Sequence, residues 1–214
     1  MAAAPVDGSL PRAPAPSAAV LVPVKAFVDA KQRLAETLGV EARRTLAQAM
    51  AETVLRAAQP LPVTVVCDHD EVRTWAEARG AEVLWTPGLG LNGAVAAGVA
   101  HLARHGFDRA VVAHADLPLA DELAWLVDGD GVTLVPDRHG DGTNVACVPS
   151  RSGFTFAYGP GSLRAHRAEA ARLGLVQRLV ADVRLGWDVD LPADLEVPAE
   201  LDPPAYLTTP VGCA

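Results

Sequence analysis

The sequence predicts an α/β fold built on a doubly wound, mainly parallel sheet, and three observations support this. Short apolar runs and helical patterns alternate along the chain as β-α-β-α-β-α-β-α-β. Several runs, such as VTVVC at Val63–Cys67, are unbroken and rich in β-branched residues, as is typical of buried parallel strands. The polar turn Asp137–Thr143 (DRHGDGT) separates two later runs and indicates an antiparallel return strand.

The expected strands are apolar segments bounded by proline, glycine or aspartate. They are Ala18–Val24, Val63–Cys67, Ala81–Trp85, Arg109–Ala115, Gly131–Pro136 and Asn144–Pro149, followed by an extended segment within Val176–Val189.

The expected helices lie between these strands. The first carries Leu46, Met50 and Val54 at intervals of four residues, the spacing of one buried helix face. Asp68 suits the N-cap of the second helix, and Gly80 its end. The predicted ranges are Val40–Ala58, His69–Arg79, Gly93–His105, Leu119–Val127, Ser162–Leu173 and Pro192–Leu195.

The chain length indicates one domain. Half of the 214 residues are hydrophobic, which is enough for a substantial core. The Ala/Pro-rich residues 1–17 lack the charged and apolar regions of a signal peptide and predict a disordered tail. We expect the folded domain to span 18–198 and a Pro-rich C-terminal extension to span 199–214.

Charge and cysteine content exclude several classes of protein. The net charge of −8 and the isoelectric point near 5.2 argue against nucleic-acid binding. No apolar run of about 18 residues indicates a membrane span. Cys67, Cys147 and Cys213 are far apart and odd in number, which suggests reduced thiols in a cytoplasmic protein.

A cationic loop follows the first strand. Among 18 lysines and arginines, only Lys25 and Lys31 are lysine, and Arg33 lies close by. Ligands of open α/β sheets bind outside the carboxyl ends of the strands, and lysine is suited to phosphate oxygens. The loop therefore predicts a phosphate site; the alternative is an ordinary solvated basic turn.

Three aspartates could bind a metal ion. Asp188 and Asp190 point to the same side if the chain there is extended, and Asp116 stands at the end of the fourth strand. Carboxylates without His or Cys partners suit a hard cation such as Mg²⁺. Alternatively, Asp116 caps a turn and the other two flank a bend.

Three further segments could bind anions. The turn GLGLNGAV offers backbone N–H groups at a helix start, although a tight helix–strand connection explains it equally well. The segment DRHGDGTNV has the small residues and hydroxyl of an anion nest, and GPGSLRAH places Gly161 and Ser162 at a helix N-terminus. Ser162 could equally be an ordinary N-cap.

The histidines give little signal. His166 suits a surface helix position, and His114 shares a strand face with Asp116, so it could line the site. We predict surface or packing roles for the others, His69, His101, His105 and His139.

Taken in order, six motifs resemble the guanylyltransferases of coenzyme F-420 biosynthesis, which use 2-phospho-L-lactate or phosphoenolpyruvate. The resemblance covers about residues 18–197. The motifs are VPVK…AK-x-RL, G-x-G-x-N-x-A-x-x-x-G, ADLPL, DGTN, GPGS-x-x-x-H and D-x-D-x-P-x-D. The chain departs from the family at Leu191, where Thr is usual, and at Gly93, where Ala is frequent.

The resemblance implies a GT-A-like nucleotidyltransferase fold, with helices on both faces of a mainly parallel, mixed sheet. It also implies transfer of GMP from GTP to a phosphorylated three-carbon acid, with release of pyrophosphate. Phosphoenolpyruvate, 2-phospho-L-lactate and 3-phosphoglycerate all remain possible acceptors, and we favour phosphoenolpyruvate. The labile product could pass directly to the deazaflavin transferase of the pathway.

The resemblance also implies the site residues. Lys25 and Asp116 would be catalytic, and Asp116, Asp188 and Asp190 would hold Mg²⁺, as two ions. GTP would contact Lys25, Lys31, Arg33, Gly90, Asn92 and Gly93. The acceptor would contact Thr143, Gly159, Gly161 and Ser162.

Two alternatives remain open from the sequence. One is a GT-A nucleotidyltransferase with a different acceptor. The other is a non-catalytic nucleotide sensor of the same fold. Release of pyrophosphate would separate an enzyme from a sensor.

Overall fold

The computed structural model describes residues 17–208, which form one seven-stranded mixed sheet. The strands are β1 (Ala18–Pro23), β2 (Val63–Cys67), β3 (Glu82–Trp85), β4 (Arg109–Ala113), β5 (Val132–Pro136), β6 (Thr143–Pro149) and β7 (Gln177–Leu179). The α-helices are α1 (Val40–Ala57), α2 (Asp70–Glu77), α3 (Gly90–Arg104), α4 (Ser162–Arg172) and α5 (Ala205–Thr208).

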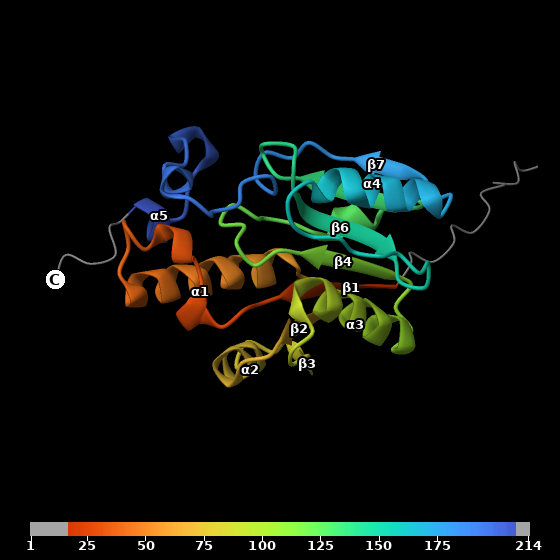
Figure 1. The fold of residues 1–214 in the computed structure, drawn as a ribbon, viewed down its shortest axis with the longest axis horizontal. Helices are drawn as coiled ribbons and strands as arrows, with labels where there is room; N and C mark the ends of the chain where they lie inside the picture. Colours follow the sequence, from red (N-terminus) through yellow and green to blue (C-terminus); the bar gives the residue numbers. More distant parts are fainter. Residues whose placement is uncertain (1–16, 209–214) are drawn as a thin grey trace, which may run out of the picture.

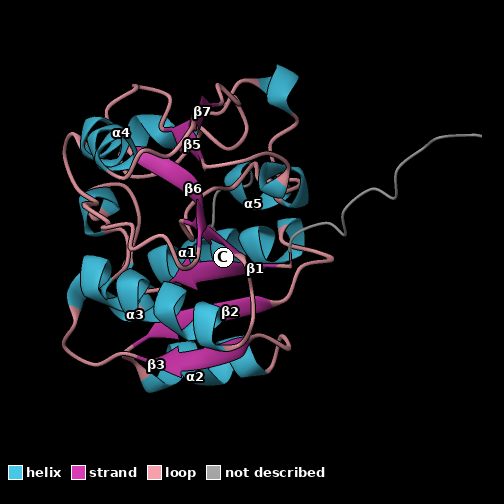
Figure 2. Cartoon of the chain, turned by 90° about the vertical axis from the view of Figure 1, so that its right-hand side faces the viewer, coloured by secondary structure: helices cyan, strands magenta, loops and turns pink. Residues whose placement is uncertain are grey.

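The sheet is mainly parallel, as predicted. Its strand order is β3-β2-β1-β4-β6-β5-β7. Figure 2 labels β3, β2, β1, β6, β5 and β7 in this order from bottom to top. Only β6 is antiparallel to its neighbours, so it is the predicted return strand. Because β1 lies between β2 and β4, with all three parallel, the carboxyl ends of these strands meet at one edge. From β1 the chain adds β2 and β3 on one side and then β4 on the other, so the strand order reverses at β1. Open α/β sheets bind ligands at the carboxyl ends of the strands beside such a reversal.

Helices cover both faces of the sheet. Alternate β1 residues point to opposite faces, so Val20 joins one core and Leu21 the other. Side chains of α1 and α2 fill the first core, and those of α3 and α4 contribute to the second. Helix α3 lies against β1, β2 and β4, and α4 lies toward the β5 and β7 end of the sheet (Figure 1). The α/β class with helices on both faces is therefore confirmed.

Gly98 allows α3 to lie close to the sheet. A Cβ at this position would stand 2.5 Å from Leu21 Cδ2 and 3.0 Å from Val66 Cγ1. The absence of a side chain here fixes the distance between α3 and β1, and with it the place of the N-terminus of α3.

Several predicted elements differ from the structure. The helix expected over 119–127 is wrong, since only a 3₁₀ turn over Ala124–Val127 forms. The Leu123 N–H bonds to the Ala57 carbonyl at the end of α1 instead of to a helical turn. Helix α3 begins at Gly90 rather than Gly93, and the late extended segment shortens to β7. The expected helix over Pro192–Leu195 is a 3₁₀ turn.

The described C-terminal residues pack onto the domain. Tyr206 and Leu207 pack against a third cluster that contains Leu34 and Met50. The Tyr206 hydroxyl lies 3.0 Å from Thr53 Oγ1 and 3.3 Å from the Pro118 carbonyl oxygen. The predicted tail of residues 1–17 lies outside the described residues except for Ser17, and the predicted domain boundary at 198 stays a prediction.

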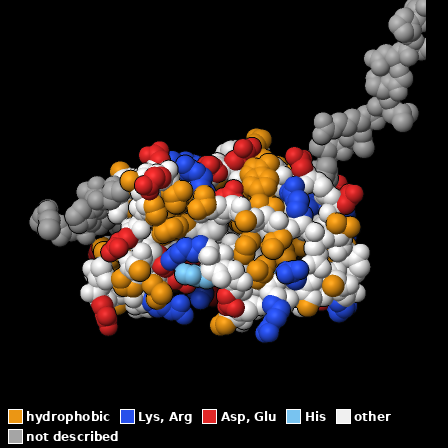
Figure 3. Space-filling model, turned by 90° about the horizontal axis from the view of Figure 1, so that it is seen from above, with side chains coloured by type: hydrophobic (Ala, Val, Ile, Leu, Met, Phe, Trp, Pro, Cys, Tyr) orange, Lys and Arg blue, Asp and Glu red, His pale blue; other side chains and the backbone are white. Residues whose placement is uncertain are grey.

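The surface and the thiols agree with the sequence. Figure 3 shows acidic, basic and hydrophobic side chains interspersed on one face, without a broad basic patch. Cys67 and Cys147 are buried and free, as expected, whereas Cys213 lies outside the described residues. Within residues 17–208, no helix is long and apolar enough to cross a membrane.

Candidate active site

A cavity of about 710 Å³ opens at the carboxyl ends of the parallel strands. Its wall includes the loop after β1, the residues that end β2 and β4, and the first turns of α3. Six of the predicted site residues line it: Lys25, Lys31, Arg33, Gly90, Asp116 and Asp190. The other wall residues of chemical interest, which the sequence reasoning did not place there, include Cys67, Asp68 and Thr86.

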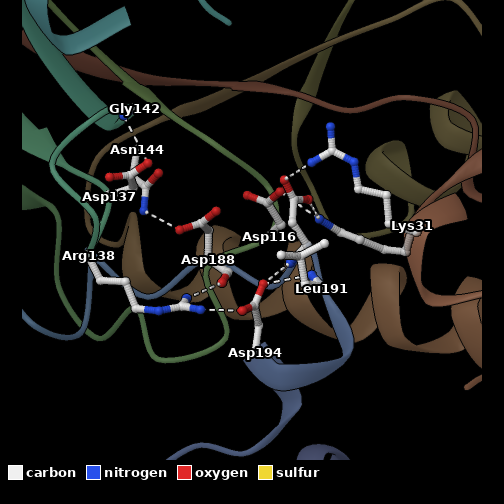
Figure 4. A network of polar contacts seen from close by, with 11 residues as sticks. Lys31, Asp116, Asp137, Arg138, Gly142, Asn144, Asp188, Leu191 and Asp194 are labelled. Atoms are coloured by element: carbon white, nitrogen blue, oxygen red, sulfur yellow. Dashed lines mark hydrogen bonds and ion pairs between the residues drawn. The ribbon is translucent and has the colours of Figure 1, made fainter. Parts of the chain in front are cut away.

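Lys31 is the centre of the site. Its Nζ lies 2.7 Å from Asp116 Oδ2 and 3.0 Å from Asp190 Oδ1 (Figure 4). Burial alone would lower the pKa of Lys31, but attraction to Asp116 and Asp190 outweighs it and raises the pKa. Lys31 has a left-handed backbone, with φ of 54°, which is costly for a residue other than glycine. The two ion pairs offset that cost.

The other two cations of the loop are more exposed. Arg33 Nη1 lies 3.6 Å from Asp190 Oδ2, and the Arg33 side chain is 71% exposed. Lys25 is exposed on the cavity wall. Both can therefore turn toward an incoming anion without leaving a buried partner unpaired.

The three predicted metal ligands converge on the same edge of the sheet. Asp116 follows β4, and its carbonyl oxygen accepts a hydrogen bond of 3.2 Å from Val189 N–H. This bond ties the segment 188–190 to the end of β4. Figure 4 shows the carboxylates of Asp116 and Asp188 projecting into the same space.

The charges of these carboxylates are coupled. Burial, followed by the charge of Asp116, raises the pKa of Asp188, and Asn144 opposes this by a hydrogen bond of 3.3 Å. Burial would also raise the pKa of Asp116, but Lys31 and then His114 lower it. Asp116 Oδ1 is buried without a hydrogen-bond partner, so one oxygen remains available to a ligand.

The carboxylates are not drawn together as tightly as in a closed metal site. Within residues 17–208, one ligand atom from each of three such side chains comes within 4.8 Å only in the group Glu82, His101 and His105. Lys31 Nζ instead stands between Asp116 and Asp190.

Asp194 and Arg138 hold the segment 188–191 in place, and the sequence reasoning missed both roles. Asp194 is buried, and its Oδ2 accepts hydrogen bonds of 2.7 Å from both Asp190 N–H and Leu191 N–H. Arg138 bonds to Asp194 Oδ1 and donates a 3.0 Å bond to the Asp188 carbonyl oxygen. The D-x-D-x-P-x-D pattern contained Asp194 and was the available signal.

The polar turn after β5 is ordered by Asp137. Its carboxylate accepts hydrogen bonds from the backbone N–H groups of His139, Asp141 and Gly142. The anion nest predicted in DRHGDGTNV is therefore already filled by a carboxylate of the same turn. The nest thus fixes the start of β6, from which Asn144 reaches Asp188.

The predicted nucleoside residues divide into two groups. Gly90, with φ of 62°, lines the cavity at the start of α3. Asn92 and Gly93 do not line it. The Asn92 amide instead bonds twice to the Tyr158 backbone, accepting from N–H at 2.7 Å and donating to the carbonyl at 3.3 Å.

The predicted acceptor residues lie away from the cavity wall. Thr143 and Ser162 are buried, and Gly159 and Gly161 adjoin the start of α4. Asp141 already accepts from Gly161 N–H at 2.9 Å through its side chain and from Leu163 N–H at 3.0 Å through its carbonyl. The role of this set in binding the acceptor stays a prediction.

Two sequence interpretations of local residues are wrong. His166 is fully buried rather than on the surface, because it shares the inner face of α4 with Ser162 and Ala170. The spacing of four residues was a signal for this face. His69, not Asp68, caps α2, since its Nδ1 accepts from Glu71 N–H at 3.3 Å. Asp68 is thereby left exposed on the cavity wall.

The chain matches a family model over residues 18–198, and the family is described as "Guanylyl transferase CofC like". It is 38% identical to the phosphoenolpyruvate guanylyltransferase of Sphaerobacter thermophilus over 167 residues, which is 74% of this chain and 81% of the relative. It is 39% identical to that of Thermomonospora curvata over 166 residues, 72% of each chain.

Solved structures support the fold. A putative nucleotide-diphospho-sugar transferase from Desulfovibrio desulfuricans has a TM-score of 0.66 at 17% identity, covering 84% of this chain and 85% of the other. A cytidylyltransferase from Leptospira borgpetersenii has a TM-score of 0.56 at 14% identity, covering 84% of both chains. The GT-A-like fold that the sequence motifs implied is therefore confirmed.

Removing Lys31 should leave the carboxylates mutually repulsive. We expect Lys31→Met to lower the free energy of unfolding by about 2 kcal/mol, because Asp116 is largely buried and Asp190 half-exposed. Added Mg²⁺ should raise the melting temperature of this variant more than that of the wild type. Lys25→Met is the matched control and should change the free energy of unfolding little. Equal melting temperatures for the two variants would contradict a stabilising role of the Lys31 ion pairs.

His166 should make the protein less stable at mildly acidic pH. Its Nε2 accepts a 3.0 Å bond from Ala157 N–H, so Nδ1 carries the proton and donates to Thr143 Oγ1 at 3.1 Å. Burial, aided by His114, lowers the pKa of His166 to about 4 from the usual 6.5. Between these values the unfolded chain binds a proton that the native one does not, so stability falls as pH decreases from 6.5 to 4.

Urea unfolding at pH 7.5 and at pH 5 measures this effect. In His166→Gln the side chain does not titrate, so the loss of stability between the two pH values should be smaller than in the wild type. An identical loss in both proteins would show that His166 does not cause it.

Proposed function

The chain belongs to the CofC-like guanylyl transferase family and is therefore a guanylyltransferase, and we propose that it transfers GMP from GTP to phosphoenolpyruvate with release of pyrophosphate. The observation that carries the proposal is the cavity at the carboxyl ends of β1, β2 and β4, where a cationic loop faces a group of carboxylates. Such a pairing of charges suits a magnesium nucleotide, which brings phosphate oxygens and a divalent cation together.

The loop after β1 would bind the GTP phosphates. Lys25 and Arg33 are exposed on the cavity wall and carry no buried ion pair. When the nucleotide enters, Lys31 Nζ would exchange its ion pairs with Asp116 and Asp190 for one with a phosphate oxygen. Lysine suits this exchange, because its flexible stem carries a single point charge with three donors.

Asp116, Asp188 and Asp190 would hold Mg²⁺, as two ions. The donor set fits, since carboxylate oxygens are the ligands that Mg²⁺ prefers and Asp116 Oδ1 is buried without a partner. Burial, followed by repulsion from Asp116, raises the pKa of Asp188, and a cation would relieve that repulsion. When bound, Mg²⁺ would neutralise charge on the phosphate oxygens of the nucleotide. Asp194 and Arg138 would keep the ligand segment in place.

The reaction needs no protein base in this proposal. A phosphate oxygen of the acceptor would attack the α-phosphorus of GTP, the bond from that phosphorus to the bridging oxygen of the β-phosphate would break, and pyrophosphate would leave. A phosphate monoester is already largely dianionic at neutral pH, because its second pKa is about 6. Lys25, Lys31 and Arg33 would position the triphosphate and neutralise the charge that develops on pyrophosphate.

The choice of acceptor and the pathway come from the relatives and from the sequence motifs. The relatives compared above are named phosphoenolpyruvate guanylyltransferases, and this name favours phosphoenolpyruvate over 2-phospho-L-lactate and 3-phosphoglycerate. We propose that the product serves coenzyme F-420 biosynthesis in the cytoplasm and passes to the deazaflavin transferase of that pathway.

A pyrophosphate-release assay tests the proposed reaction. With GTP, Mg²⁺ and the deazaflavin transferase with its substrate present, we expect release with phosphoenolpyruvate and much less with the other two acids, because the pocket must distinguish a double bond from a hydroxyl-bearing or saturated carbon. Release with 2-phospho-L-lactate alone would change the acceptor. Nucleotide binding without release with any acid would favour a non-catalytic nucleotide sensor.

The same assay tests the metal ligands. We expect Asp116→Asn and Asp188→Asn to lower turnover at least 100-fold, because each change removes a charged ligand of the Mg²⁺ that would neutralise the developing phosphate charge. Both variants should keep the wild-type far-UV circular dichroism spectrum. The control Asp130→Asn alters an exposed aspartate outside the cavity wall and should keep full turnover. Near-normal turnover in the Asp116 variant would refute its role.

A further inference from the structure

A second cluster of metal-binding side chains lies at the opposite end of α3 from the cavity. It consists of Glu82 at the start of the edge strand β3, His101 in the last turn of α3 and His105 at the C-cap of that helix. One ligand atom from each residue lies within 4.8 Å of the other two. Gly90, on the cavity wall, stands eleven residues before His101 on the helix, which corresponds to roughly 16 Å.

The two histidines are spaced for joint coordination. Residues four apart on a helix lie on the same face, and the imidazole centroids of His101 and His105 are 4.1 Å apart. His101 Nε2 lies 2.8 Å from Glu82 Oε1. In tetrahedral zinc sites with bonds of about 2.0–2.1 Å, neighbouring ligand atoms are about 3.4 Å apart. Small side-chain rotations would bring the three atoms to such distances.

Hydrogen bonds orient two of the three side chains. His105 Nδ1 lies 2.9 Å from the His101 carbonyl oxygen, which can only accept, so Nδ1 carries the proton and Nε2 keeps a free lone pair. The Thr64 hydroxyl donates a 3.0 Å bond to Glu82 Oε2, which leaves Oε1 directed at His101. Partners of this kind are what metal-ligating histidines and carboxylates have in established sites.

The electrostatic surroundings favour a cation. The cluster lies at the C-terminal end of α3, where the helix dipole is negative. The His101 side chain is 13% exposed and that of Glu82 is 50% exposed, so an ion could enter from solvent and retain a water ligand. A simple ion pair between Glu82 and His101 would use neither the orientation of His105 nor its free Nε2.

We propose that Glu82, His101 and His105 bind a borderline divalent transition-metal ion, of which Zn²⁺ is the type, and that this site is separate from the aspartate site. Two imidazoles and one carboxylate match zinc, nickel, copper or cobalt and are a poor match for Mg²⁺ or Ca²⁺. The bound ion would join the edge strand β3 to α3 and so stabilise the helix whose first turns form the cavity wall.

The test uses the full-length, untagged protein with Cys213→Ser, because Cys213 lies outside the described residues and its thiol could bind zinc. Excess Mg²⁺ is kept present to occupy the aspartates. Titration with Zn²⁺ against a chromogenic chelator should show one site per chain. His101→Ala and His105→Ala should each abolish it, and Thr64→Val should weaken it roughly 10-fold to 100-fold by freeing Glu82.

Two further measurements distinguish a real site from nonspecific binding. Co²⁺ should give the intense visible absorption of a four-coordinate ion in the wild type but not in His105→Ala, and Zn²⁺ should raise the melting temperature of the wild type but not that of His105→Ala. His139→Ala, which removes an exposed histidine elsewhere, should bind Zn²⁺ normally. Absence of equimolar binding, or its persistence in both histidine variants, would overturn the proposal.

Discussion

The ion pairs of Lys31 with Asp116 and Asp190 are the interaction on which the rest of the site depends. Three carboxylates brought together at one edge of a sheet repel one another, and burial followed by the charge of Asp116 raises the pKa of Asp188. Lys31 balances two of these charges from a loop whose backbone is itself unfavourable. The protein thus keeps the segment 188–190 beside Asp116 with a positive charge of its own.

The fold explains why these distant segments meet. Strand β1 pairs in parallel with β2 and β4, so the loop that carries Lys31 and the turn that carries Asp116 leave the sheet at the same edge. The chain then returns through β5, β6 and β7 and places Asp188 and Asp190 there, fixed by Asp194 and Arg138. In the proposed reaction, Lys31 would leave Asp116 and Asp190 for a phosphate oxygen of GTP. Mg²⁺ would then balance the charges of the carboxylates in its place. The electrostatic environment is therefore prepared before the substrate arrives.

The sequence predicted what depends on local pattern. Strand β2 was predicted with its observed bounds because an unbroken β-branched run between prolines and a helix cap has few alternatives. The meeting of Lys31 and Asp116 was foreseeable because residues after parallel strands share an edge. The sequence did not predict features that depend on tertiary contacts. Leu123 bonds to the end of α1 in place of the expected helix, and His166 is buried by the packing of α4. Asn92 stands in a glycine-rich turn of the kind that binds ligands, but its amide bonds to the backbone of Tyr158, which is distant in sequence.

The most direct test of this account is a crystal structure with GTP and Mn²⁺ as a replacement for Mg²⁺. The account predicts anomalous scattering peaks beside the carboxylates of Asp116 and Asp188, GTP phosphates against the loop after β1, and Lys31 Nζ on a phosphate oxygen instead of between Asp116 and Asp190. GTP bound in the cavity without manganese at these carboxylates, with Lys31 still holding both, would contradict it.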